Sequence, residues 1–131
     1  ELVSDETAKL MHGYTYSGHP TAAAAAVANI QVIEDEGLVN AAQRIGQRMS
    51  EGFTALLGDA MIQSFRGIGG IWACEVGGDA IPARDAMIDS GVVCRAIGEA
   101  IAFCPPLIIT DDEIGTIFDT LSDVLKQRSD M

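Results

Sequence analysis

A loop of glycines and hydroxyl residues between positions 12 and 20 offers the first candidate chemistry in this chain. The stretch reads His-Gly-Tyr-Thr-Tyr-Ser-Gly-His-Pro and runs straight into an alanine-rich segment. Proline suits the first position of a helix, and the free N–H groups at a helix start attract anions. Loop hydroxyls beside such a helix end are a plausible phosphate cradle. A glycine-rich turn more often only connects two elements, so the spacing by itself favours a plain connector.

Arg95 is the second candidate, because it directly follows the apolar run of residues 92–94. A charged side chain at the end of an apolar strand needs a partner, and the planar guanidinium suits a carboxylate or a phosphate. That partner is either a bound anion or a nearby acid such as Glu99, which would make the arginine purely structural. The residues alone favour neither interpretation.

The other residue types that often carry chemistry predict no further site. Lys9 and Lys126 lie in polar surroundings, whereas a lysine that forms a Schiff base is usually desolvated. His12 and His19 flank the loop without a third ligand, so we expect no metal site. The cysteines are odd in number and widely spaced, so we expect reduced packing residues at Cys74, Cys94 and Cys104.

Charge and composition narrow the class of protein. The chain has 131 residues, of which 48% are hydrophobic, and a formal net charge of −11. This length suits one domain with a real core. The negative charge disfavours binding to nucleic acids and to anionic membrane surfaces. No apolar run is long enough to cross a bilayer, and no signal peptide is visible. Together with the reduced cysteines, this predicts a cytoplasmic protein.

Hydrophobic periodicity predicts four helices. They cover residues 20–36, 38–58 and 80–90, and a stretch from 111 to near the carboxyl end. The first three are expected to end at glycines, namely Gly37, Gly58 and Gly91. In the third helix, Ala83, Met87 and Ile88 are expected to face the core. Thr110 and Glu113 have the spacing of a capping box, which opens the fourth helix.

Short apolar runs bounded by glycine or proline predict four strands in two hairpins. The first hairpin pairs residues 61–66 with 71–76, and the second pairs residues 92–95 with 100–103. The expected architecture is therefore an α+β domain, with helices packed on a small, mainly antiparallel sheet.

Four stretches in order resemble the class III aminotransferases, which are pyridoxal-phosphate enzymes of fold type I. The loop at residues 12–20 resembles the family loop that precedes an alanine-rich helix. Residues 65–69, Phe-Arg-Gly-Ile-Gly, resemble the family's VRGxG strand turn. Residues 93–95 resemble a late strand that ends in arginine, and residues 103–110 resemble the PPLIIT segment before the last helix. The likeness spans essentially the whole chain.

The resemblance implies that this chain is a carboxyl-terminal fragment, because family members are much longer. Residues 1–20 would then return from a large domain and carry the cofactor-phosphate loop. Residues 21–57 would be connecting helices, and residues 58–131 a small carboxyl-terminal domain. The Schiff-base lysine would lie upstream, so this chain is expected to hold no catalytic residue and to be inactive alone.

The resemblance also implies roles for three residues. Thr15 matches the threonine that reaches the cofactor phosphate of the neighbouring subunit in a homodimer. Tyr14 matches an aromatic position that lines the same site, where the family often has phenylalanine. Arg95 matches the mobile arginine that binds the substrate carboxylate in the ω-transaminase branch, a task that suits its bidentate fork.

The implied reaction moves an amino group between an amine or ω-amino acid and a keto acid such as pyruvate, with pyridoxal 5'-phosphate as cofactor. Two alternatives stay open. The chain could be a non-catalytic module that packs against a partner, or part of another class III enzyme, such as an aminomutase or a decarboxylating relative.

Overall fold

The computed structural model describes residues 13, 15 and 17–129, and it divides into a unit that ends at Glu36 and a unit that begins at Gly37. Helix α1 (Pro20–Asp35) belongs to the first unit and follows the prediction closely. Gly37 has the left-handed φ of +62° expected of a residue that ends a helix. None of the side chains of α1 is buried.

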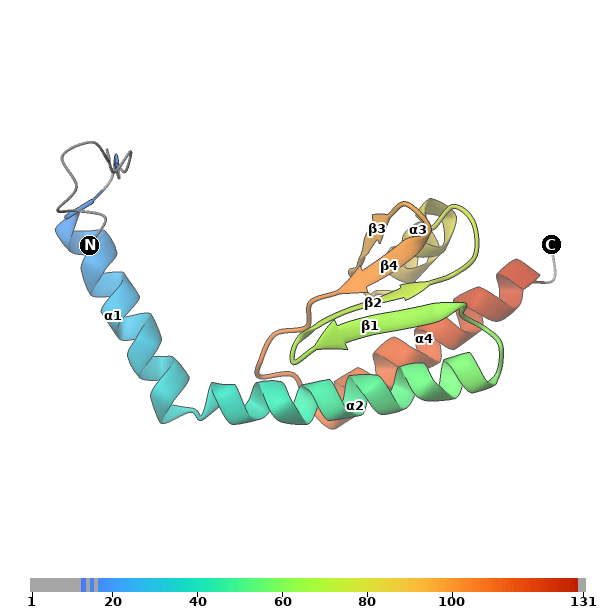
Figure 1. Ribbon diagram of the computed structural model, residues 1–131, viewed down its shortest axis with the longest axis horizontal. Helices are drawn as coiled ribbons and strands as arrows, with labels where there is room; N and C mark the ends of the chain where they lie inside the picture. Colours follow the sequence, from blue (N-terminus) through green and yellow to red (C-terminus); the bar gives the residue numbers. More distant parts are fainter. Residues whose placement is uncertain (1–12, 14, 16, 130–131) are drawn as a thin grey trace, which may run out of the picture. The chain divides into compact units, whose positions relative to one another are not determined.

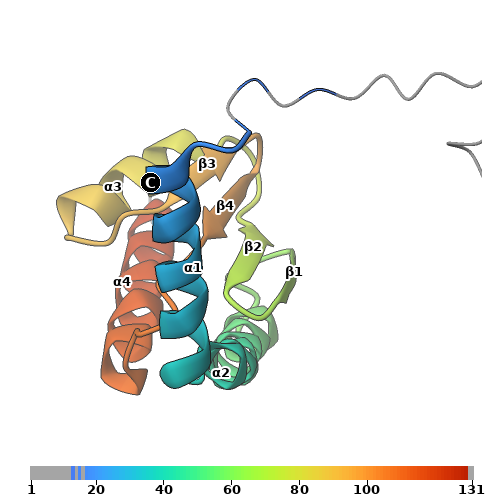
Figure 2. The same ribbon diagram turned by 90° about the vertical axis from the view of Figure 1, so that its left-hand side faces the viewer.

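The second unit is an α+β fold, as predicted from the sequence. Its helices are α2 (Leu38–Gly58), α3 (Ile81–Asp89) and α4 (Asp111–Ser129). Its strands are β1 (Ser64–Ile68), β2 (Ile71–Glu75), β3 (Arg95–Ile97) and β4 (Ala100–Phe103). The strands form one sheet in the order β1-β2-β4-β3, and every neighbouring pair is antiparallel. Helices α2 and α4 lie along the sheet (Figure 1), and α3 packs against α4 and the edge strand β3 (Figure 2).

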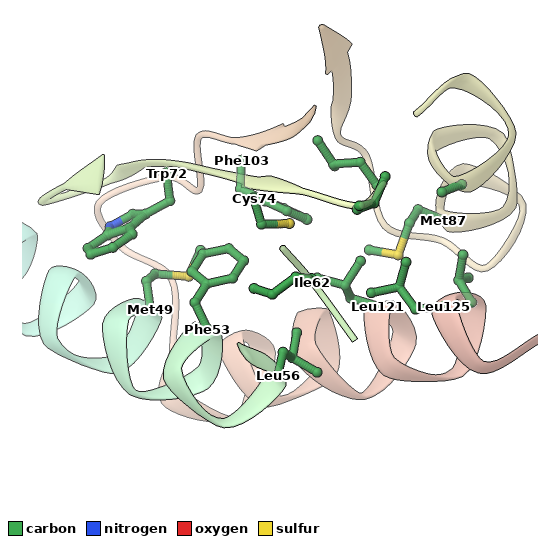
Figure 3. Close-up of a cluster of buried hydrophobic side chains, with 14 of the residues drawn as sticks. Met49, Phe53, Leu56, Ile62, Trp72, Cys74, Met87, Phe103, Leu121 and Leu125 are labelled. Carbon is green, nitrogen blue, oxygen red and sulfur yellow. The ribbon is translucent and has the colours of Figure 1, made fainter. Parts of the chain in front are cut away.

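The core forms where α2 and α4 meet one face of the sheet. Ile45, Met49, Phe53 and Leu56 recur every three or four residues along α2, and all four are buried. Figure 3 shows Phe53 beside Met49, with its ring directed from the helix toward Trp72 and Phe103 on the sheet. Its ring lies 5.0 Å from that of Phe118 and 5.9 Å from that of Trp72. Helix α2 is therefore an integral part of the core of the second unit.

The strands alternate between a core face and an outer face. The register aligns Phe65, Cys74, Ile101 and Ala96 on the four strands, and all of them pack in or against the core. Gly67 lies opposite Trp72, and a Cβ atom at Gly67 would lie 2.3 Å from the indole ring. This close approach explains why the turn motif at residues 65–69 needs glycine in this chain.

Three strands differ from their predicted bounds, of which β2 only ends one residue early, at Glu75. β1 begins at Ser64 rather than at 61, although Ile62 before it is buried. β3 begins only at Arg95, so the prediction of a strand over residues 92–94 was wrong. The reason is that the Val92 N–H donates to the carbonyl of Met87 and so completes the end of α3. Ile88 is 43% exposed, which corrects its predicted place in the core.

The ends of α2 and α4 are stabilised by local hydrogen bonds. At the end of α2 the left-handed residue is Ala60, with a φ of +56°, rather than the expected glycine. Met61 donates to the carbonyl of Leu56 across this turn. At the start of α4, the predicted capping box is confirmed. Thr110 donates its N–H to the Glu113 carboxylate at 2.8 Å, and the Glu113 N–H donates to the Thr110 hydroxyl at 3.2 Å.

Candidate functional site

Thr15, Ser17 and His19 are the described residues of the loop that could contact an anion. Thr15 lies in a turn and is exposed, so its hydroxyl is accessible. Gly18 has a φ of +78°, a conformation that few other residues adopt and that turns the chain into α1. Tyr14 lies outside the described residues, as do Lys9 and His12.

The start of α1 offers fewer free donors than the sequence suggested. The Nδ1 atom of His19 accepts a hydrogen bond from the Ala22 N–H at 3.3 Å, so this histidine caps the helix. The Ala23 N–H donates to the carbonyl of His19, and Pro20 has no N–H to offer. Thr21 is then the one first-turn residue whose N–H finds no acceptor in the described part of the chain. A phosphate at this loop would depend mainly on the loop hydroxyls.

Arg95 begins the edge strand β3 and is exposed. The argument that a charge is out of place there was therefore wrong, because the side chain stands on the outer face rather than in the core. Over residues 13, 15 and 17–129, the Arg95 guanidinium has neither an ion pair nor a hydrogen bond, and it does not pair with Glu99. The purely structural interpretation of Arg95 thus loses its support.

The other described cations all have protein partners. Arg44 and Arg48 pair with Asp111, which ties α2 to the start of α4. Arg128 donates to the carbonyls of Val76 and Gly77. The remaining cations pair with carboxylates, namely Arg66 with Glu75, Arg84 with Asp85 and Lys126 with Asp123. Arg95 is therefore the one Lys or Arg in the described ranges without an ion pair or a hydrogen bond to the protein.

The three cysteines are free but differ in their surroundings. Cys74 is buried in the core, and this burial raises the pKa of its thiol to about 12. Cys94 is half-buried, and burial raises its pKa too, while the nearby Arg84 guanidinium opposes the rise. Cys104 is exposed, so the expectation that all three are packing residues was wrong for this one.

Cys104 lines a largely apolar groove of about 480 Å³ between the segment before β3 and the start of α4. Its walls include Val92, Pro105 and Ile117. The polar side chains in the wall are Glu113 and Thr116. The Glu113 carboxylate already accepts hydrogen bonds from Thr110, which lower its pKa. The groove can therefore bind an apolar group, and one oxygen of its Glu113 carboxylate is already engaged by Thr110.

Lys126 is exposed on α4 and lies 3.7 Å from a carboxylate oxygen of Asp123. This surface position agrees with the sequence, and it gives no desolvated amine for a Schiff base. Within the described ranges no group of histidine, cysteine or acidic side chains is arranged to hold a metal ion.

Comparison with known proteins decides the family. The profile of the family described as Aminotransferase class-III matches residues 1–125. The chain belongs to the class-III aminotransferases. It is 30% identical to the probable gamma-aminobutyrate transaminase 3, mitochondrial, of Oryza sativa subsp. indica, over 136 residues.

Solved transaminases have the same fold. A structure described as a transaminase with L-ala superposes with a TM-score of 0.84 at 33% identity, covering 92% of this chain and 32% of the other. The omega transaminase from Pseudomonas jessenii in complex with PMP gives a TM-score of 0.79 at 34% identity, with 90% and 29% coverage. The rice alignment covers 94% of this chain but 27% of the rice protein. This class-III aminotransferase chain thus spans about a third or less of its relatives.

The sequence did not single out Arg66, which shares the outer sheet face with Arg95. Arg66 pairs with Ala73 across β1 and β2, and Ala102 pairs with Arg95 across β4 and β3. The alternation of side chains along the two hairpins, with a period of two residues, could have placed Arg66 on the outer face of the sheet. The shared face of Arg66 and Arg95 followed only from the register of β3, because the predicted strand ended at the residue where β3 begins.

No helix in the described part of the chain is long and apolar enough to span a membrane.

Proposed function

We propose that the chain works as the carboxyl-terminal part of a pyridoxal-phosphate-dependent aminotransferase. The whole enzyme would move an amino group between an amine or ω-amino acid and a keto acid such as pyruvate. The family match over residues 1–125 supports the reaction class. The observation that supports substrate binding is the exposed guanidinium of Arg95 on the edge strand β3, which has no partner within the described residues.

The described residues fit one end of the cofactor. The accessible hydroxyl of Thr15 can donate a hydrogen bond to a phosphate, and Gly18, with its positive φ, turns the chain into α1. The lysine that the structure describes, Lys126, is paired at the surface and does not suit a Schiff base. We therefore assign this chain to phosphate contact and substrate binding. When bound, pyridoxal phosphate supplies the electron sink for the reaction.

Arg95 would bind and orient the carboxylate of the keto acid. A guanidinium offers two parallel N–H donors, which match the two oxygens of a carboxylate. Because Arg95 has no partner among residues 13, 15 and 17–129, a ligand carboxylate would not have to compete with a salt bridge from these residues. In the absence of a carboxylate, the exposed side chain can move aside and leave room for an uncharged amine.

The same proposal includes a homodimer and a division of the chain into domains. A homodimer would let Thr15 and Tyr14 reach the cofactor of the neighbouring subunit. Residues 1–20 would return from a large domain, and residues 21–57 would connect it to a small domain at residues 58–131, with α2 of the connection packed into the core of that domain. The three free cysteines support a reducing compartment, such as the cytoplasm.

A graft tests this function directly. The part of the Pseudomonas jessenii omega transaminase that this chain matches is replaced with residues 1–131, and amino transfer from an amine to pyruvate is measured. We expect transfer by the graft. We also expect Thr15→Ala to weaken cofactor binding by about 1.5–3 kcal/mol, the value of one hydrogen bond to a charged group. Thr54→Ala, an exposed threonine on α2, serves as the matched control. Unchanged cofactor affinity in Thr15→Ala would refute the phosphate assignment.

The expectation that this chain holds no catalytic lysine has its own test. The 131-residue chain mixed with pyridoxal phosphate should show no absorbance of a lysine-bound cofactor. A strong band that disappears on Lys9→Gln would instead indicate that this chain holds its own catalytic lysine.

A further inference from the structure

His19 ends the loop and caps helix α1. Its Nδ1 atom accepts a hydrogen bond from the Ala22 N–H at 3.3 Å, and its backbone carbonyl accepts one from the Ala23 N–H. A ring nitrogen of histidine accepts a hydrogen bond only while it carries no proton, so the capping imidazole is neutral and holds its proton on Nε2. The cap therefore depends on the protonation state of a single side chain.

Helix α1 depends on such local interactions more than the other helices do. None of its side chains is buried, so packing within the described part of the chain does not hold it. Its first turn contains no acidic residue, and no described side chain other than His19 accepts a hydrogen bond from that turn. A helix of 16 residues without tertiary packing is only marginally stable in water. Loss of the cap should therefore lower the helix population at the start of α1.

Protonation of His19 opposes the start of the helix in two ways. The Nδ1 atom becomes a donor, so it can no longer accept the Ala22 N–H. The ring also gains a positive charge at the N-terminus of the helix, where the helix dipole is already positive. The other ionisable side chains described in this unit are Glu34, Asp35 and Glu36, which lie at the opposite end, more than about 20 Å away along the helix. None of these carboxylates is close enough to offset the new charge.

We propose that His19 is a pH-sensitive cap, which holds the start of α1 as a helix only while its imidazole is neutral. The stabilisation is present above the pH range in which histidine side chains ordinarily titrate, and it is lost as the pH falls through that range. The cap lies where the loop that carries Thr15 enters the helix, so its loss also releases the end of this loop. That consequence for cofactor contact rests on the proposed function, whereas the cap itself does not.

The experiment follows the start of α1 by NMR spectroscopy of the 131-residue chain labelled with ¹³C and ¹⁵N. The ¹³Cα shifts of Thr21 and Ala22 report the local helix population, and the shift of Ile45, which is buried in the second unit, is the internal reference. Between about pH 8 and pH 5, we expect the helix–coil equilibrium constant at the start of α1 to fall about fivefold, the typical effect of losing one N-cap. The shift of Ile45 should stay constant.

Variants assign the change to one imidazole. His19→Asn supplies a cap that does not titrate in this range, so the helix start should persist at both pH values. His19→Ala should show a reduced helix population at both. His12→Gln removes the other histidine of the chain and should leave the pH dependence unchanged. The fluorescence of Trp72 shows whether the second unit of each variant is folded.

A helix start that stays constant from pH 8 to pH 5 in the unmodified chain would overturn the inference, because the cap would then not depend on the proton. A pH dependence that persists in a folded His19→Asn variant would also overturn it, because another group would then be responsible. Neither result bears on the phosphate contact of Thr15, since that contact is tested separately by cofactor binding in the Thr15→Ala variant.

Discussion

Replacing Phe53 with alanine should remove a large share of the stability of the second unit. Phe53 is fully buried, and its ring centroid lies 5.0–5.9 Å from those of Phe118, Phe65, Trp72 and Phe103. Loss of a buried phenylalanine costs about 3–5 kcal/mol. Because this ring contacts β1, β2, β4 and α4 at once, the neighbours cannot all move in to fill the cavity. We therefore expect the upper half of that range.

Urea unfolding followed by the fluorescence of Trp72 measures this loss. Trp72 is the one tryptophan of the chain and is buried beside Phe53, so its emission reports on the same core. A domain of this size has a total stability of about 5–15 kcal/mol. Val39→Ala removes an exposed side chain from the same helix and should change the free energy of unfolding by less than about 0.5 kcal/mol. A loss below about 1 kcal/mol for Phe53→Ala would refute the packing of α2 on the sheet.

Two further predictions concern a helix end and the thiols. Ala60→Gly should raise the free energy of unfolding by up to about 1 kcal/mol, because glycine adopts the left-handed φ of +56° without steric cost. A fall in the urea midpoint would contradict this assignment. In thiol labelling with a disulfide reagent at pH 8, Cys104 should react first and Cys74 last, because Cys74 is buried with a pKa of about 12. Rapid labelling of Cys74 in the folded chain would count against the buried core.

Helices and their ends were largely predictable from the sequence. The pattern of Ile45, Met49, Phe53 and Leu56 gave the correct bounds and buried face of α2, and the spacing of Thr110 and Glu113 gave the start of α4. These signals are local, since side-chain periodicity and capping involve residues within one or two turns.

Strand bounds depended on contacts that a local pattern does not contain. Ile62 is apolar and buried, yet it lies in the connection from α2, because a connecting residue can also fill the core. Val92 looked like the start of a strand, but its N–H completes the end of α3. These two errors displaced β1 and β3 by about three residues.

The same limit applied to the candidate site. Arg95 could be singled out as an unusual charge, but its exposure followed only from the true start of β3 at the sheet edge. The alignment of Arg66 with Arg95 depended on three successive strand registers, and a one-residue error in any of them would have put the two side chains on opposite faces.

The turnover of a keto acid by the Arg95→Ala variant of the graft tests the central claim most directly. With an uncharged amine as donor, single-turnover rates and kcat/KM for pyruvate are measured separately, and Lys126→Ala serves as the control. We predict that kcat/KM for pyruvate falls by an amount equivalent to about 2–5 kcal/mol, while the amine half-reaction stays close to that of the unmodified graft. Equal losses in the two half-reactions, or no loss for pyruvate, would contradict the account.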